Sequence, residues 1–581
     1  MLKIEPAGAR TILERLRSAG IMIESPCNGK GLCGKCKVRV LSGQAPALTE
    51  QEEKRLTADE IASGIRLACL TVPESTVEID PLGLLEEQAG NVLGDGETPD
   101  VPLDPLVTAE RIAVHGPDLK NCWSLCEAVE NAIGCAVNLP LPLLRKLPEL
   151  MGKTELWYIC HGGRAVDLRG EKRIYGLAVD IGTTTVAAAL IDLDTGNVCA
   201  EDGFVNPQKA FGLDVLSRIH YDMEHPGGVL ELQKAIVQRL QQSAEKMAAA
   251  AGIPSDSIYE VVVGGNSTML HALLGIGLKS LGVAPYSSVF THPMTVSARE
   301  LGFELNQEAV VYCISSVSTY IGGDIVAGVL ASRIDEAKDT VLFVDIGTNG
   351  EIVLSQKGTM YACSCAAGPA LEGMNISCGM RAEPGAVEHV SLEGETAVLS
   401  VIGQTAPLGL CGSGLLEAVS QAVGKGVIGK TGRISADSPF VRTGEDGKRR
   451  IVLDEEHGIC LTQNDIRQVQ FCKGAVLSGI LTLMERLRMT EKDIDRVIVA
   501  GQFGRHLNPE SLTGAEVIPP ALGNRISYIG NSSMVGARLC LLNQSERLRA
   551  ERIARQVEYI ELSVSPGYEK RFTRCLQFGG V

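Results

Sequence analysis

The sequence lacks the marks of an exported, membrane-spanning or nucleic-acid-binding protein. Residues 1–6 hold no apolar segment and no small-residue cleavage site, so we expect no signal peptide. No uninterrupted apolar run reaches the ~18 residues that a membrane helix needs, which predicts no membrane partner. With 54 lysines and arginines against 70 acidic residues, the formal net charge of −16 opposes binding to phosphate backbones, and we expect no nucleic-acid partner. These absences favour a cytoplasmic protein.

Cysteine, in contrast, is plentiful, with 18 in the chain. Without an export signal, so many cysteines indicate reduced thiols or metal ligands rather than a disulfide framework. The length of 581 residues exceeds what one hydrophobic core serves and predicts about three or four domains. A hydrophobic content of 45% excludes a disordered chain.

The first informative motif is a cysteine cluster with the spacing C-x5-C-x2-C, followed by a distant fourth cysteine. The ligands that it offers are Cys27, Cys33, Cys36 and Cys69. Three thiolates on one tight loop and a fourth from a separate segment can enclose a 2Fe–2S cluster. Gly29, Gly31 and Gly34 let such a loop turn sharply and aim amide N–H groups at the sulfurs. Structural zinc and inert buried thiols are the alternatives, but zinc sites usually include histidine, and none precedes His115.

The cysteine spacing resembles that of adrenodoxin-like 2Fe–2S ferredoxins, whose first gap is one residue longer than in plant-type ferredoxins. Residues 1–83 are therefore expected to form a small β-grasp ferredoxin-like domain. Within it, residues 11–19 are predicted as a helix, 36–40 as a strand and 77–79 as a strand that closes the sheet. Since the helix begins only a few residues into the chain, the first hairpin is abbreviated, which would fit a late start site.

Residues 84–105 combine glycine, proline and acidic residues with little periodicity. They are predicted as a linker that lets the cluster domain swing. Residues 106–172 are predicted as a small α+β middle domain with a helix near 123–133. Its cysteines are Cys122, Cys126, Cys135 and Cys160. We interpret them as small core residues, because a second cluster normally needs a compact triad.

Residues 173–581 alternate apolar β-branched runs, glycine turns and helical stretches, which predicts an α/β domain. Residues 177–192 place an Asp-Ile-Gly-Thr turn between two strands, and residues 341–354 repeat this arrangement. Such a turn offers N–H groups and hydroxyls to phosphate oxygens, while its aspartate can hold hydrated Mg²⁺. Two copies predict duplicated halves that clamp one phosphate chain from both sides.

This span resembles the superfamily of acetate and sugar kinases, heat-shock chaperones and actin. Its elements follow the superfamily's order: phosphate loops at 180–185 and 345–350, connecting helices at 320–328 and 529–537, and an adenosine motif at 497–504. The resemblance implies an actin-like ATPase domain with ATP and Mg²⁺ as cofactors. The catalytic residues that it implies are Asp180, Asp345 and Asp324. The nucleotide-binding residues that it implies are Gly182, Thr183, Thr184, Thr185, Gly347, Thr348, Asn349, Gly350, Gly501, Gln502 and Gly504.

Three further motifs carry less weight. Residues 424–431 fit the P-loop pattern G-x-x-x-x-G-K-[ST], but they follow a helix-like run rather than a strand, so we expect no working P-loop. The pair Cys363 and Cys365 after the second phosphate loop is interpreted as packing rather than redox chemistry. Residues 412–414 either approach the nucleotide or form only a tight turn.

The combination of a 2Fe–2S domain with an ATPase narrows the function. ATP is useful when electron transfer runs uphill, and a gap of about 100 mV costs about 2–3 kcal/mol per electron. The whole chain resembles the reductive activators of corrinoid enzymes, which carry a 2Fe–2S domain, a linker, a middle domain and an ATPase in this order. The resemblance implies ATP-driven electron transfer from the cluster to the cob(II)amide of a partner corrinoid protein, which restores cob(I)amide for methyl transfer.

The same resemblance implies an upstream low-potential electron donor, and it leaves a homodimer open. The corrinoid is expected on the partner, since the cobalamin-carrier signature D-x-H-x-x-G does not occur in the sequence. Two alternatives stay open. One is an ATP-driven activator of a dehydratase or ring reductase. The other is a redox-sensing ATPase clamp without net electron delivery.

Overall fold

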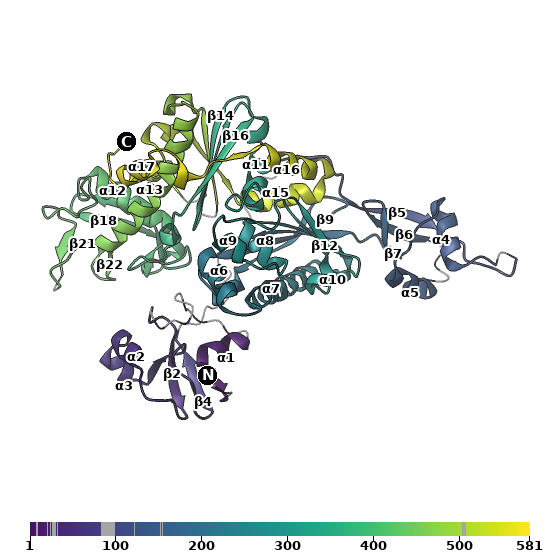
Figure 1. The fold of residues 1–581 in the computed structure, drawn as a ribbon, viewed down its shortest axis with the longest axis horizontal. Helices are drawn as coiled ribbons and strands as arrows, with labels where there is room; N and C mark the ends of the chain where they lie inside the picture. Colours follow the sequence, from purple (N-terminus) through teal and green to yellow (C-terminus); the bar gives the residue numbers. More distant parts are fainter. Residues whose placement is uncertain are drawn as a thin grey trace.

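The structure is a computed structural model of the chain. It describes residues 1–581 apart from 7, 9, 20, 22, 24, 26–28, 30, 32, 83–98, 121, 151–152, 154, 445, 502–506 and 581. The described residues form a small N-terminal domain, a second small unit and a large α/β domain of two halves (Figure 1). Most of the predicted linker lies outside the described residues. None of the helices in the described ranges is long and apolar enough to cross a membrane.

The N-terminal domain is a four-stranded sheet in the order β1-β4-β2-β3, covered by short helices. Its elements are β1 (Leu2–Ile4), α1 (Ile12–Ser18), β2 (Lys37–Ser42), α2 (Glu50–Arg55), α3 (Ala58–Ala62), β3 (Ile65–Leu67) and β4 (Val77–Pro81). The predicted first helix is confirmed, and a capping box between Thr11 and Glu14 fixes its start. The strand predicted at 77–79 does not close the sheet. It is the inner strand β4, because it pairs with β1 on one side and with β2 on the other, and Val77 and Ile79 are fully buried.

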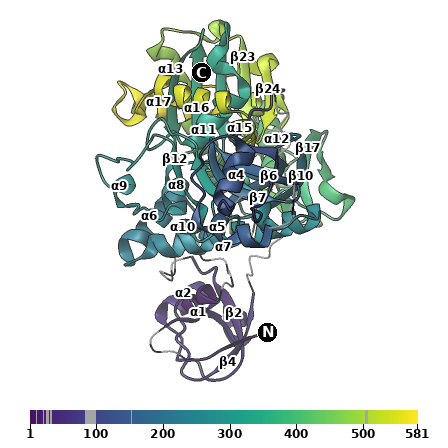
Figure 2. The ribbon, with the colours of Figure 1, turned by 90° about the vertical axis from the view of Figure 1, so that its right-hand side faces the viewer.

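The second unit is a three-stranded antiparallel sheet in the order β5-β6-β7, with two helices against it. Its elements are β5 (Val107–Ala113), α4 (Leu125–Ile133), α5 (Leu141–Leu150), β6 (Glu155–His161) and β7 (Arg164–Arg169). The predicted helix is confirmed as α4. The interpretation of the cysteines as core residues is wrong for Cys122 and Cys135, which are exposed because they lie outside the helix, whereas Cys126 and Cys160 pack against the small core. Figure 2 views the molecule from the side of this unit.

The first half of the large domain is built on a six-stranded sheet in the order β10-β9-β8-β11-β13-β12. Its strands are β8 (Tyr175–Ile181), β9 (Thr185–Asp192), β10 (Val198–Val205), β11 (Ile258–Gly265), β12 (Met294–Ser297) and β13 (Val310–Cys313). Its helices are α6 (Val215–Glu224), α7 (Gly228–Ala251), α8 (Ser267–Leu273), α9 (Lys279–Gly282), α10 (Ala298–Leu301) and α11 (Gly323–Ser332), with the short 3₁₀ segment η1 (Pro207–Ala210). Strand β8 runs antiparallel to β9 and parallel to β11.

The second half repeats this plan with a six-stranded sheet in the order β24-β23-β14-β15-β16-β25. Its sheet strands are β14 (Thr340–Ile346), β15 (Gly350–Gln356), β16 (Thr359–Cys365), β23 (Arg496–Ala500), β24 (Ile526–Gly530) and β25 (Glu558–Tyr559). Its helices are α12 (Gly412–Gly424), α13 (Gln463–Arg486), α14 (Pro509–Gly514), α15 (Ser532–Leu542), α16 (Gln544–Gln556) and α17 (Tyr568–Cys575), with the 3₁₀ segment η4 (Pro369–Glu372). Strand β14 runs antiparallel to β15 and parallel to β23, as β8 does with its neighbours, so the duplication is confirmed.

Two small sheets extend the second half. They consist of β17 (Ala386–Glu393), β18 (Thr396–Val401) and β19 (Gly409–Leu410), and of β20 (Val441–Thr443), β21 (Arg449–Asp454) and β22 (Ile459–Thr462). Residues 424–431, which fit the P-loop pattern, begin at the end of α12 and lead into turns. The segment therefore does not lie between a strand and a helix, as a working P-loop would, which confirms the expectation from the sequence.

The connecting helices α11 and α15 cross between the two halves at the centre of Figure 1. Glycine makes the close crossing possible: a Cβ atom at Gly536 would lie 2.3 Å from the carbonyl oxygen of Ala327. Although α15 directly follows β24 of the second half in sequence, it packs on β8 and β11 of the first half. The two halves are therefore tied together directly behind their phosphate loops.

Candidate nucleotide and cluster sites

The two phosphate loops are tight turns at the carboxyl ends of equivalent strands. Asp180 is the next-to-last residue of β8, and Asp345 holds the same place in β14. In the first loop a Cβ atom at Gly182 would lie 2.6 Å from the carbonyl oxygen of Thr185, so the turn requires glycine. In the second loop the N–H of Gly347 donates to the carbonyl oxygen of Asn349 at 3.0 Å.

The loops face one another across a single carboxylate, that of Glu372 at the end of η4. The hydroxyl of Thr184 donates to its Oε2 atom at 2.8 Å, and the hydroxyl of Thr348 donates to its Oε1 atom. The two phosphate loops therefore come together at one point, as the clamp hypothesis predicts. Sequence analysis missed Glu372, and the only available signal was its place in the glycine-rich stretch after the second loop.

A group of partly buried acids lies behind the loops. Asp180 accepts hydrogen bonds from Ser533 Oγ at 2.7 Å and from Asn531 Nδ2 at 3.0 Å, at the start of α15. Burial, and then the charges of Asp345 and Asp180, raise the pKa of Asp324 to about 7. Burial, and then the charge of Asp180, raise the pKa of Asp345 to about 7. These aspartates repel one another in the absence of a cation.

A fourth acid, Glu351, was missed from the sequence because it follows the second loop in an otherwise ordinary strand. Burial, and then the charges of Asp324 and Asp345, raise its pKa well above the usual range. Ser364 donates to Glu351 Oε1 at 3.4 Å from the adjacent strand β16. The aspartates and Glu351 therefore share one electrostatic environment.

The acids fit a hydrated cation better than a directly bound one. Among the residues that the structure describes, no group of three or more His, Cys, Asp or Glu side chains has the geometry to hold a metal ion directly. Mg²⁺ usually keeps several water molecules and takes only one or two carboxylates together with substrate phosphates. A cluster of repelling carboxylates beside two phosphate loops suits that mode of binding.

A buried arginine supports the first phosphate loop from behind. Arg218 of α6 is fully buried, and its guanidinium donates to the carbonyl oxygens of Thr183 and Gly212. Burial lowers the pKa of Arg218 to about 9. On the other side of the same loop, Asn266 Nδ2 donates to Thr183 Oγ1 at 3.1 Å. The backbone and the hydroxyl of Thr183 are thus both fixed, and sequence analysis had assigned no role to Arg218.

The predicted adenosine motif is only partly within the described residues. Gly501 follows β23 with a φ of 99°, and a Cβ atom there would lie 3.0 Å from Asp345 Oδ1. Position 501 therefore requires glycine, because the chain there has a positive φ and passes close to the second phosphate loop. Gln502 and Gly504 lie outside the described residues.

The cluster loop brings cysteines from two segments together. Hydrogen bonding to Cys69 is the main cause that lowers the pKa of Cys36 to about 7, towards the thiolate form that ligates metals. Gly29 has a φ of 81°, and a Cβ atom there would lie 3.8 Å from Cys69 Cβ, so the loop passes directly beside this cysteine. Cys33 is partly buried on the same loop, while Cys27 lies outside the described residues. This donor set fits an iron–sulfur cluster.

The cluster domain contacts the large domain near α6, below the first half in Figures 1 and 2. The guanidinium carbon of Arg17 lies 6.0 Å from the ring centroid of Phe211, which in turn lies 5.0 Å from the ring of Tyr221 in α6. The charge of Arg17 also acts on Cys36 and Cys69. Phe211, which packs on Tyr221 of α6, therefore lies beside the cluster domain, and the buried arginine of the same helix contacts the first phosphate loop.

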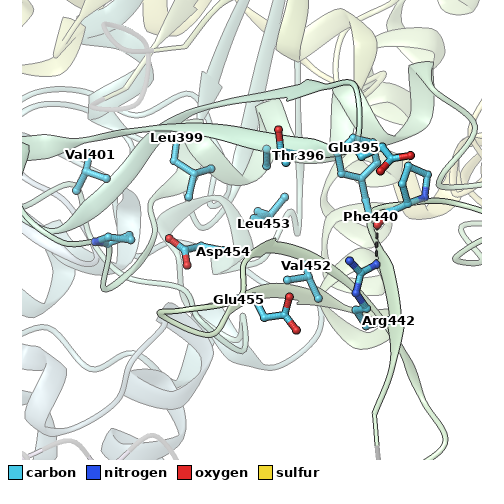
Figure 3. Close-up of a pocket in the computed structure, with 13 residues that line it drawn as sticks. Glu395, Thr396, Leu399, Val401, Phe440, Arg442, Val452, Leu453, Asp454 and Glu455 are labelled. Atoms are coloured by element: carbon cyan, nitrogen blue, oxygen red, sulfur yellow. Dashed lines mark hydrogen bonds between the residues drawn. The ribbon is translucent and has the colours of Figure 1, made fainter.

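The second half also carries a groove of about 440 Å³ between β18 and β21 (Figure 3). Its lining combines apolar side chains such as Leu399 and Leu453 with the acids Glu395 and Asp454. Arg442 is fixed at one end by a hydrogen bond to the carbonyl oxygen of Pro439 at 2.6 Å. None of the phosphate-loop residues lines this groove.

Comparison with known proteins gives family models for the N-terminal domain and for each half of the large domain. The family model of the 2Fe-2S iron-sulfur cluster binding domain matches residues 2–74. The model of the RACo middle region matches residues 175–337, and that of the C-terminal domain of RACo, the ASKHA domain, matches residues 339–580. The matched middle region is thus the first half of the large domain rather than residues 106–172.

Similarity extends over nearly the whole chain in one curated relative, "Corrinoid activation enzyme RamQ" from Eubacterium limosum. It is 31% identical over 97% of this chain and 95% of the relative. The chain belongs to the family of corrinoid activation enzymes. A solved structure described as a reductive activator for corrinoid, iron-sulfur protein is 33% identical, with a TM-score of 0.74 over 99% of this chain and 96% of that one.

A more distant member of this group covers the chain less completely. It is "[Co(II) methylated amine-specific corrinoid protein] reductase" from Methanosarcina barkeri, which is 23% identical over 66% of this chain and 73% of its own length. The family resemblance inferred from the sequence, the ferredoxin-like N-terminal domain and the ATPase fold are confirmed. A 2Fe–2S cluster and ATP are the cofactors that these domains support.

Proposed function

We propose that this protein uses ATP to drive an electron from its 2Fe–2S cluster to the corrinoid of a partner protein. The observation that carries the proposal is the joint presence, in one activator-like chain, of a cluster-binding domain and two facing phosphate loops. In the reaction, cob(II)amide gains one electron and becomes cob(I)amide, the form that accepts methyl groups. ATP hydrolysis offsets the unfavourable potential difference of this transfer.

Each end of the chain has its own task in this proposal. Cys27, Cys33, Cys36 and Cys69 hold the cluster, which supplies the electron when bound. In the ATPase domain the loop amides and threonine hydroxyls bind phosphates, while Asp180 and Asp345 orient Mg²⁺ through its water molecules. Asp180 and Asp345 also organise the attacking water, Asp324 interacts electrostatically with both, and Gly501 and Gly504 let the chain approach the adenosine.

The proposal also includes the domain boundaries of the chain, its partner proteins and its location in the cell. Residues 1–83 carry the cluster, 84–105 link it, 106–172 form the small middle domain, and 173–581 hydrolyse ATP. The corrinoid protein of a methyltransferase system is the partner, and an upstream low-potential donor reloads the cluster in the cytoplasm. A homodimer is compatible with this arrangement.

The test mixes reduced protein with an oxidised corrinoid protein under anaerobic conditions, with and without ATP and Mg²⁺. Growth of the cob(I)amide absorption band only with ATP is the expected result. Cys33→Ala should abolish reduction but keep ATP hydrolysis, and Asp345→Ala should abolish both. An Asp345→Ala variant that hydrolyses ATP at the native rate would contradict the site assignment.

The same experiment separates the alternatives. An intact cluster and active ATPase without any cob(I)amide would favour another low-potential acceptor, such as a dehydratase or ring reductase. ATP turnover that follows the oxidation state of the cluster, without net electron delivery to any acceptor, would favour the redox-sensing clamp.

A further inference from the structure

Glu372 is a negatively charged group placed where two phosphate loops meet. Its Oε2 atom accepts from the hydroxyl of Thr184 in the first half, and its Oε1 atom accepts from the hydroxyl of Thr348 in the second. Two carboxylate oxygens held by two hydroxyl donors resemble two oxygens of a bound phosphate. The distance of 2.8 Å to Thr184 Oγ1 is an ordinary O–H···O hydrogen bond.

The backbone that carries Glu372 is fixed to the second half of the domain. Ala370 and Leu371 are buried in the core of that half, and the N–H of Gly368 donates to the carbonyl oxygen of Thr348 at 2.8 Å. Directly after Glu372, Gly373 has a φ of 75°, and a Cβ atom there would lie 2.2 Å from the carbonyl oxygen of Met380. The side chain of Glu372 therefore extends to the first half from a base that is anchored in the second.

A hydroxyl has only one proton to donate. A phosphate held by Thr184 and Thr348 must therefore take the two protons that Glu372 now accepts. Like charge adds to this competition, because a carboxylate between the loops repels phosphate oxygens. A phosphate bound through both of these hydroxyls and the observed position of Glu372 therefore exclude one another.

We propose that Glu372 competes with the nucleotide phosphates for the hydroxyls of Thr184 and Thr348, and that ATP displaces it from both threonines. The proposal rests on the ATP site proposed above. Displacement breaks the hydrogen bond between Glu372 of η4 and the first phosphate loop. Binding of phosphate therefore changes the position of η4, the segment that follows the second loop. Glu372 thereby lowers the affinity for nucleotide, and its displacement couples nucleotide binding to a movement of η4.

The competing interpretation is that Glu372 stays in place and orients the water that attacks the γ-phosphate. The two roles predict different changes in nucleotide binding and ATP hydrolysis when the carboxylate is removed. A displaced competitor, once neutralised, lets nucleotide bind more tightly. A water-orienting group, once neutralised, slows hydrolysis and leaves binding unchanged.

The experiment measures binding of the non-hydrolysable analogue AMPPNP with Mg²⁺ by titration calorimetry on the full chain. We expect Glu372→Gln to tighten binding by about tenfold, which corresponds to 1.4 kcal/mol. The matched control is Glu393→Gln, which removes an exposed carboxylate that also accepts from a serine hydroxyl, at 3.1 Å from Ser391. The control should bind as the wild type does.

A second pair of variants tests the mechanism. In a Thr348→Val background one of the two contested protons is absent, so the gain from Glu372→Gln should shrink to about threefold or less. Visible absorption of the cluster and far-UV circular dichroism verify that each variant is folded.

Unchanged or weaker AMPPNP binding in folded Glu372→Gln, beside normal binding in the wild type, would overturn this inference alone. Absence of binding in the wild type as well would overturn the ATP site and this inference together. Tighter binding that persists in full without the Thr348 hydroxyl would also refute the stated competition.

Discussion

Replacing Asp345 by asparagine should stabilise the nucleotide-free ATPase domain while abolishing its activity. The pKa of Asp345 is raised from 3.8 to about 7 by burial and by the charge of Asp180. The folded state therefore keeps a proton up to about pH 7, whereas the unfolded chain releases it near pH 4. Folding stability falls as the pH rises between these values and stays low above them.

The size of this effect follows from the shift. About three pKa units at about 1.4 kcal/mol each give about 4 kcal/mol as an upper bound. Because the side chain of Asp345 is only partly buried and keeps contact with solvent, we take about half of that, or about 2 kcal/mol. Asp345→Asn removes this penalty above pH 7 and changes little below about pH 3, where the carboxyl is protonated in both states.

Differential scanning calorimetry of nucleotide-free protein at pH 5 and pH 8 measures the difference. The variant should unfold at a higher temperature at pH 8, with less than half of that gain at pH 5. The control is Asp339→Asn, whose exposed carboxylate pairs with Arg496, which lowers its pKa, so this substitution should not stabilise at either pH. Equal gains at both pH values, or a loss at pH 8, would refute the reasoning.

Three further predictions follow from individual contacts. Arg218→Leu removes the hydrogen bond to the carbonyl oxygen of Thr183. An unsatisfied buried polar group costs about 1–3 kcal/mol, which should distort the first phosphate loop. AMPPNP affinity, measured by calorimetry, should therefore fall about tenfold. Unchanged affinity would show that Arg218 does not shape the phosphate loop. Arg17→Gln removes a positive charge that acts on the cluster cysteines, so the midpoint potential of the cluster should become more negative in a redox titration. A shift towards positive potential would contradict this electrostatic account. Gly536→Ala places a methyl group 2.3 Å from the carbonyl oxygen of Ala327, and overpacking of about 1–3 kcal/mol should lower the unfolding temperature of the ATPase domain. An unchanged unfolding temperature would mean that α11 and α15 can separate without cost.

The phosphate loops illustrate how far the sequence leads. Asp180 and Asp345 could be found because each ends an apolar strand and begins an Asp-Ile-Gly-Thr turn, and both the strands and the turns are local structure. The strand at 77–79 was also recognised, but its central position in the sheet was not, since neighbours in a sheet depend on contacts between distant segments.

The sequence by itself determined the cluster motif, the duplicated strand–turn–strand units and their order, because each depends on residue spacing within a short window. Only the tertiary structure decided that Glu372 joins Thr184 to Thr348, and that Arg218 lies behind Thr183. Glu372 and Thr184 are brought together by packing of the two halves, whereas Arg218 and Thr183 are brought together by packing within the first half. Packing depends on the surfaces of whole helices and sheets, and no local pattern records which side chains those surfaces bring into contact.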